Sequence, residues 1–145
     1  MSRLTGIAMM FALLFLGISL HAAADGQFID IAPKTEGQIQ LVLDTLDASI
    51  NDNEPGLPAI VMMLHGEEAH RFLRNNYQAN KALVDQAAKL AAYRVIEVQI
   101  CATWMRMNGY SKSDLFPFVS SVPLGAAELE RLATEEGYSE FTVDL

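Results

Sequence analysis

The sequence is poor in cysteine and in basic residues. Cys101 is the only cysteine among 145 residues, so an internal disulfide is excluded. Lys and Arg number 10 against 18 Asp and Glu, which gives a formal net charge of −8. This acidic balance argues against nucleic acid and anionic membrane surfaces as partners. A chain of this length supports one domain with its own core.

Several motifs that carry common chemistry are also missing. The chain has no Walker loop, no G-x-G-x-x-G fingerprint and no nucleophile elbow. His65 and His70 are five residues apart, a spacing that does not share one helical face, so we expect no metal site. Met62 and Met63 fit a buried strand better than a copper site. We therefore expect neither a metal nor a cofactor.

The N-terminus has the three parts of a secretory signal peptide. Arg3 is followed by an uncharged apolar run of 14 residues, 7–20, and then by Ala22-Ala23-Ala24. The run is shorter than the ~20 residues that span a bilayer. We predict that residues 1–24 are a cleaved signal peptide and that 25–145 form a single domain. The mature protein would be periplasmic or secreted, with no membrane partner after cleavage.

Strand-like and helix-like segments alternate along the predicted domain. Apolar and β-branched runs predict strands, and helical spacing of apolar residues predicts helices. Thr35 and Gln38 form a capping-box pattern at the first helix. The predicted strands are 27–31, 59–64, 95–101, 118–122 and 139–143; the predicted helices are 36–52, 67–73, 75–93, 102–107 and 125–133, the last with Gly137 as its C-cap.

This alternation predicts an α/β fold, with a five-stranded, mostly parallel sheet and helices on both faces. The carboxyl ends of parallel strands share one edge of the sheet, where sites in such folds cluster. His65 follows one predicted strand and Cys101 ends the next, so we expect both at this edge. A following helix N-terminus would favour the thiolate form of Cys101.

Three explanations of Cys101 remain open from the residues alone. A lone cysteine in an exported protein is buried and inert, bonded to another chain, or reactive. His65 likewise fits either an assistant to the thiol or a histidine that caps a strand. Trp104 beside Cys101 fits a shielded pocket, an oligomer contact or ordinary core.

Three sequence blocks resemble one known family. They are Val61-Met62-Met63-Leu64-His65-Gly66, Val98-Gln99-Ile100-Cys101-Ala102-Thr103-Trp104-Met105, and the segment 122–138, which begins Val-Pro-Leu-Gly and ends Gly-Tyr. In this order, with an α/β pattern between them, they resemble the DsrE/DsrF-like proteins over most of residues 28–143. The resemblance implies a three-layer sandwich that assembles as a homo-oligomer, a trimer or a hexamer.

The resemblance also implies a function. The matching cysteine, Cys101, would accept sulfane sulfur as a persulfide from a sulfur-donor protein, and His65 would assist. We expect Gly66, Ala102, Thr103 and Trp104 to form the substrate-binding surface. The family's sulfur-relay members are cytoplasmic, whereas this chain carries an export signal.

Two other functions fit the same sequence. One is a non-catalytic oligomeric module that binds a ligand or a protein and holds Cys101 as a buried structural residue. The other is a redox sensor in which Cys101 pairs between chains.

Overall fold

The computed structural model of the protein describes residues 26–50 and 57–143. The predicted signal peptide, residues 1–24, lies outside these ranges, as does the predicted end of the first helix at Asp52. Within them, all strand pairs are parallel, in the order β4-β3-β2-β1-β5. The predicted five-stranded α/β fold is confirmed. The strands are β1 (Gln27–Asp30), β2 (Ile60–Leu64), β3 (Ile96–Cys101), β4 (Val119–Val122) and β5 (Ser139–Glu140).

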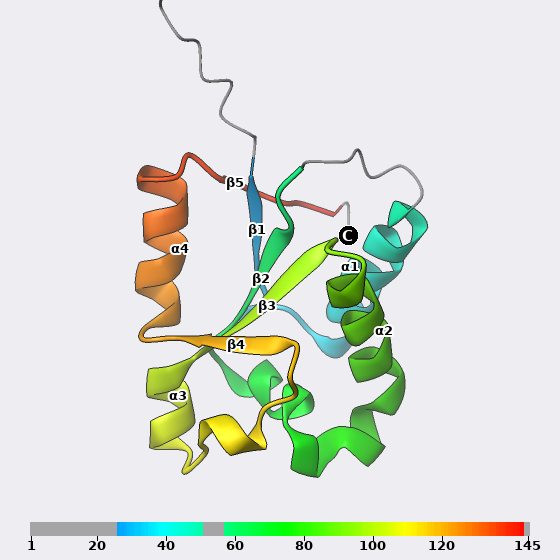
Figure 1. Ribbon diagram of the computed structural model, residues 1–145, viewed down its shortest axis with the longest axis vertical. Helices are drawn as coiled ribbons and strands as arrows, with labels where there is room; N and C mark the ends of the chain where they lie inside the picture. The colour runs from blue at the N-terminus through cyan, green and yellow to red at the C-terminus, as the bar shows by residue number, and fades with distance from the viewer. Residues whose placement is uncertain (1–25, 51–56, 144–145) are drawn as a thin grey trace, which may run out of the picture.

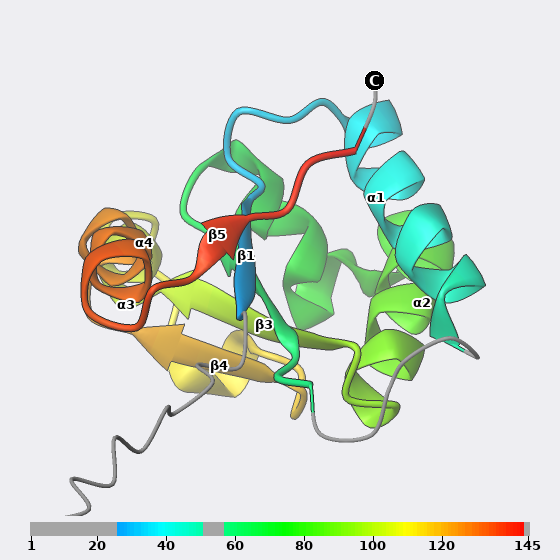
Figure 2. The same cartoon turned by 90° about the horizontal axis from the view of Figure 1, so that it is seen from above.

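Helices cover both faces of the sheet, as predicted. One face carries α1 (Glu36–Ala48) and α2 (Lys81–Ala92), and the other carries α3 (Ala102–Met107) and α4 (Gly125–Thr134) (Figures 1 and 2). In the described ranges, the connections contain the short 3-10 helices η2 (Glu67–Phe72), η3 (Arg74–Asn80) and η4 (Lys112–Asp114). Within the described ranges, no helix has both the length and the apolar character needed to cross a membrane.

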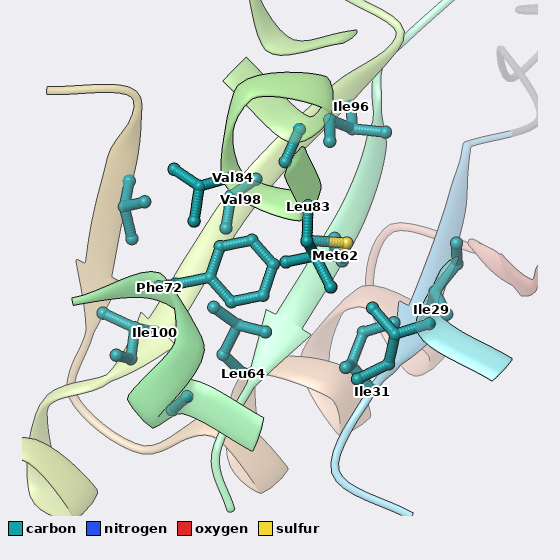
Figure 3. Packing of buried hydrophobic residues seen from close by; sticks show 14 of the residues in the cluster. Ile29, Ile31, Met62, Leu64, Phe72, Leu83, Val84, Ile96, Val98 and Ile100 are labelled. Atoms are coloured by element: carbon teal, nitrogen blue, oxygen red, sulfur yellow. The ribbon is translucent and has the colours of Figure 1, made fainter. Parts of the chain in front are cut away.

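The main core lies between the sheet and the layer that contains α1, α2 and η2. Phe72 is completely buried and points at the strands from η2 (Figure 3). Alternate residues of the strands face it, because side chains along a strand point to opposite faces in turn. Those labelled in Figure 3 are Ile29, Ile31, Met62, Leu64, Ile96, Val98 and Ile100, with Leu83 and Val84 from α2.

The first helix begins where the sequence predicts. Thr35 is the N-cap of α1, and both hydrogen bonds of the capping box with Gln38 are present. The helix ends earlier than predicted, at Ala48. The Ser49 hydroxyl donates to the carbonyl of Leu46 at 2.8 Å, a local bond that competes with helix continuation.

The predicted long helix 75–93 is wrong in its first part. Residues up to Asn80 form the 3-10 helix η3, and the α-helix begins only at Lys81. The Asn76 side chain donates to the carbonyl of His70, and the Asn80 side chain donates to the carbonyl of Asn76. Asparagine side chains that bond to the backbone in this way favour turns over regular helix. No residue of η3 is buried, so core packing does not favour a regular α-helix over these side-chain hydrogen bonds.

The last predicted strand and helix cap also differ from the structure. β5 contains two residues rather than the predicted 139–143, and it pairs only with Gln27 and Phe28 of β1. Beyond it, Phe141 and Val143 pack against the core. The C-cap of α4 is Glu135, whereas Gly137 lies two residues later with φ +72°. Gly137 thus supplies the left-handed turn that returns the chain to the sheet.

Candidate functional site

Four neighbouring strands end side by side at the carboxyl edge of the sheet. Asp30 ends β1, His65 follows β2, Cys101 ends β3 and Val122 ends β4. Leu64 is in register with Ile100, and Cys101 is in register with Val122, so His65 and Cys101 lie next to each other along this edge. The helices α3 and α4 begin here, at the lower left of Figure 1.

His65 is bound to the strand on its other side. Its Nε2 lies 2.9 Å from Oδ1 of Asp30, and both side chains are roughly one quarter exposed, at 25% and 29%. With the carboxylate oxygen as acceptor, the Nε2–H tautomer of His65 donates this hydrogen bond. The same Oδ1 accepts the backbone N–H of Ala32 at 3.0 Å. Asp30 is therefore held by its own turn and fixes one end of the imidazole.

The helix α4 holds the base of the same imidazole. A Cβ on Gly125 would lie 2.8 Å from Cβ of His65 and 3.2 Å from Sδ of Met63. Such separations are too short for a real methyl group, so the helix packs this closely only because Gly125 lacks a side chain. The Val-Pro-Leu-Gly segment thus packs directly against His65.

Glu68 holds the backbone of His65. Its Oε1 accepts the N–H groups of His65 and Gly66, at 2.8 and 2.9 Å. Glu68 is 3% exposed, and its second carboxylate oxygen, Oε2, is buried without a hydrogen-bond partner among the described residues. Gly66 is extended, at φ −132°, but a Cβ there would lie 2.7 Å from that Oε2. A Cβ at position 66 would therefore displace this carboxylate oxygen, whereas the backbone angle itself suits any residue.

Cys101 is a free thiol at the junction of β3 and α3. It is the N-cap of α3, and its Sγ accepts the backbone N–H of Trp104 at 3.4 Å. An N–H donor stabilises the thiolate form of a cysteine. Cys101 is 4% exposed, and in the described ranges no hydrogen bond joins its Sγ to His65.

A group of aromatic rings packs beside the start of α3. The His70 ring meets Trp104 edge-on at 4.8 Å, and Trp104 stacks with Tyr110 at 5.8 Å between centroids. The Tyr110 hydroxyl lies 3.3 Å from Nδ1 of His70. These contacts bury Trp104 in the core, and they bring His70 to α3 rather than to His65.

The other predicted site residues divide into two groups. Gly66 lies against Glu68, as described above. Ala102 and Thr103 are partly exposed in the first turn of α3, and the Thr103 hydroxyl donates to the carbonyl of Pro123 at 2.9 Å. That bond ties α3 to the segment that leads into α4.

Sequence reasoning missed Asp30 and Glu68. Asp30 had a detectable signal, because it is an acidic residue at the end of a predicted strand that shares the edge with His65. Glu68 was visible only as part of an acidic pair beside His65. Its buried position depends on the 3-10 turn of η2, which the sequence pattern does not distinguish from an α-helix.

A concave surface among the described residues lies away from this row of strand ends. It measures about 500 Å³ and borders the free edge of β4. Arg74 and Lys112 flank it, and neither forms an ion pair within the described ranges. Its remaining lining consists of Leu115, Phe116, Pro117, Val119, Ser120 and Ser121. No group of three or more His, Cys, Asp or Glu side chains in the described ranges is arranged to hold a metal ion.

The fold and the carboxyl edge of the sheet together define a class of protein: an all-parallel α/β domain with polar side chains at the carboxyl ends of adjacent strands. A solved structure of the same fold is that of MTH1491, a protein of unknown function from Methanobacterium thermoautotrophicum. The TM-score is 0.60 at 19% sequence identity, over 80% of this chain and 95% of that chain. This likeness is one of fold. No protein-family model and no curated protein matches the sequence.

Proposed function

We propose that this protein is an exported member of the DsrE/DsrF-like family that carries sulfane sulfur as a persulfide on Cys101. One observation carries the proposal. The thiol of Cys101 ends a strand next to His65, and His65 is itself bound to Asp30. A nucleophile, an imidazole and an orienting carboxylate on adjacent strand ends are the components of an activated thiol site. The three sequence blocks that resemble the family contain both Cys101 and His65.

The proposed reaction needs no external oxidant. The Cys101 thiolate attacks the outer sulfur of a donor persulfide, R–S–SH. A new S–S bond forms on Cys101 while the S–S bond of the donor breaks. The donor leaves as R–S⁻ and takes up a proton as its thiol. The transferred sulfur keeps its oxidation state, and an acceptor thiol reverses the step.

The residues around Cys101 have separate parts in this proposal. The N–H of Trp104 stabilises negative charge on Sγ before attack and on the persulfide afterwards. His65, oriented by Asp30, would act as a general acid or base at the adjacent strand end. The partly exposed first turn of α3, with Ala102 and Thr103, would meet the donor.

Mass spectrometry of the intact protein after polysulfide treatment tests the proposal. We expect wild type to gain sulfur on Cys101 and to lose it on reduction. Cys101→Ser should gain none, while Tyr93→Lys, a change at the 62% exposed C-cap residue of α2, should load like wild type. Equal loading of wild type and Cys101→Ser would contradict the proposal.

The burial of Cys101 supports a second candidate, a binding module with a structural cysteine. A thiol that is 4% exposed is poorly accessible to a donor, and the hollow beside β4 offers a separate ligand surface with two cationic side chains. The rate at which native Cys101 reacts with a charged thiol reagent separates the two candidates. Fast reaction in the native protein supports sulfur transfer. Reaction only after denaturant is added supports the binding module.

A further inference from the structure

We propose that Glu68 is a positioning residue that keeps the His65 ring bound to Asp30. This inference deepens the proposed function, and its meaning for sulfur transfer rests on that function. The geometric part of the inference is independent of that function, because it concerns only the side chains of Glu68, His65 and Asp30 and the backbone of His65.

The hydrogen bonds of Glu68 determine the path of the chain after β2. A single carboxylate oxygen accepts two consecutive N–H groups, those of His65 and Gly66. Two such bonds fix the peptide planes on both sides of the His65 Cα. They therefore set the direction in which the His65 side chain leaves the backbone.

The burial of Glu68 indicates a role beyond simple packing. Its Oε2 is buried without a hydrogen-bond partner among the described residues, and burying a polar atom in this way is unfavourable. An apolar residue of similar size would avoid that cost but would leave two backbone N–H groups without an acceptor. The absence of a Cβ at Gly66 also leaves room for this oxygen.

Three independent contacts then hold His65. Glu68 fixes its backbone, Gly125 packs against its Cβ, and Asp30 accepts a hydrogen bond from its Nε2. The first of these contacts fixes the peptide planes on both sides of the Cα, so losing it should release the ring from Asp30 even though Asp30 is still present. Preorganisation of this kind lets a site present its groups without rearrangement.

Glu68→Ala, Glu68→Gln and Glu67→Ala form the test set. Glu68→Gln keeps an accepting oxygen and removes the charge, whereas Glu68→Ala removes the acceptor. Glu67 is the matched control, because it is the adjacent glutamate and its side chain is 91% exposed. The readout is the Nε2–H resonance of His65 in a ¹H–¹⁵N spectrum at low temperature, identified by its absence from His65→Asn. A proton held in a hydrogen bond exchanges slowly enough to be seen, and a free imidazole N–H does not.

We expect the resonance in wild type, Glu67→Ala and Glu68→Gln, and its loss in Glu68→Ala and Asp30→Ala. Circular dichroism on each variant distinguishes this local loss from unfolding. Persistence of the resonance in Glu68→Ala, or its absence from wild type, would overturn the proposal. Loss in Glu68→Gln to the same extent as in Glu68→Ala would also overturn it, because charge rather than position would then matter.

Gly66→Ala tests the proposal if Glu68→Ala does not fold. It keeps every hydrogen-bonding group but places a methyl 2.7 Å from Oε2, so the carboxylate must move. We expect it to lose the His65 resonance, and a retained resonance would contradict the proposal.

Sulfur loading of the same variants keeps the two proposals apart. If Cys101 carries sulfur, Glu68→Ala should load more slowly, by up to ~100-fold, the loss that a misplacement of about 1 Å can cause. If wild type takes up no sulfur, the proposed function fails, while the spectra still decide the role of Glu68.

Discussion

Gly125 and Gly37 make a matched pair at the scale of single residues. Both lie in the first turn of a helix, but a Cβ on Gly125 would be 2.8 Å from His65, while a Cβ on Gly37 would meet nothing within 4 Å. We expect Gly125→Ala to lower the free energy of unfolding by ~1–3 kcal/mol through overpacking. Gly37→Ala should raise it by up to ~1 kcal/mol, because alanine loses less backbone entropy in a helix.

Urea unfolding of the two variants measures both effects. Gly125→Ala should also perturb the His65 resonance, since the methyl group pushes on its Cβ. Equal stability of the two variants would mean that α4 can move away from the strand ends at no cost.

The residue scale also shows what the sequence could predict about the site. His65 and Cys101 were expected at one edge because each follows an apolar run, and parallel pairing of β2 and β3 places them there. Asp30 and Glu68 were not singled out. Their importance comes from which atoms they reach in three dimensions: Asp30 contacts a residue 35 positions away, and Glu68 reaches back across its own turn.

At the scale of elements, α4 carries an ion-pair network with a defined pH dependence. Arg131 donates to both carboxylate oxygens of Glu128, at 3.0 and 2.8 Å, and to Glu136 at 2.7 Å. The hydrogen bonds from Arg131 lower the pKa of Glu128 below its usual 4.5. A carboxyl whose folded pKa is depressed adds stability above its unfolded pKa, and that stability is lost as the pH falls through the folded value.

Arg131→Gln therefore has an expected pH profile. At neutral pH it should lower the free energy of unfolding only slightly, because exposed ion pairs are screened by solvent. The difference from wild type should shrink as the pH falls below about 4.5, where Glu128 is protonated in the unfolded chain. Lys112→Gln is the control, because it removes a charge without breaking an ion pair within the described ranges. A difference that stays constant to low pH would show that the network contributes through packing alone.

The elements show why local patterns predict strands better than they predict helix type. β2 and β3 are apolar runs with strong strand preference, and the structure begins both within one residue of the predicted start. The segment up to Asn80 has helix-like spacing, yet its asparagine side chains bond to the backbone and tighten it into η3. β5 is short because only two residues find partners on β1, a tertiary limit that the sequence pattern does not contain.

At the scale of the whole molecule, two large apolar side chains are exposed on α3 and at the start of α4. Met107 is 82% exposed at the end of α3, and Leu124 is 49% exposed at the start of α4. The Thr103–Pro123 hydrogen bond joins the two segments. We propose that copies of the mature chain meet through this surface and expect light scattering to give the mass of a trimer or hexamer.

Two variants test that assembly. Met107→Lys combined with Leu124→Lys should shift the protein to monomer, because two charges would have to be buried at the interface. Tyr93→Lys is the control, since Tyr93 is 62% exposed at the far end of α2. A monomeric wild type, or an unchanged mass in the double variant, would contradict this prediction.

If residues 1–24 are a cleaved signal peptide, as the sequence predicts, the start of the domain limits when it can be removed. Gly26 is buried, and the ring of Tyr138 occupies the space where a Cβ at position 26 would lie. A cut after Ala24 would leave only Asp25 between the new N-terminus and this buried glycine. A peptidase that met the folded chain would find its cleavage site one residue from the buried Gly26. Maturation and folding would then compete in time: the chain must be cut before β1 enters the sheet, and a precursor that folds first would keep its leader.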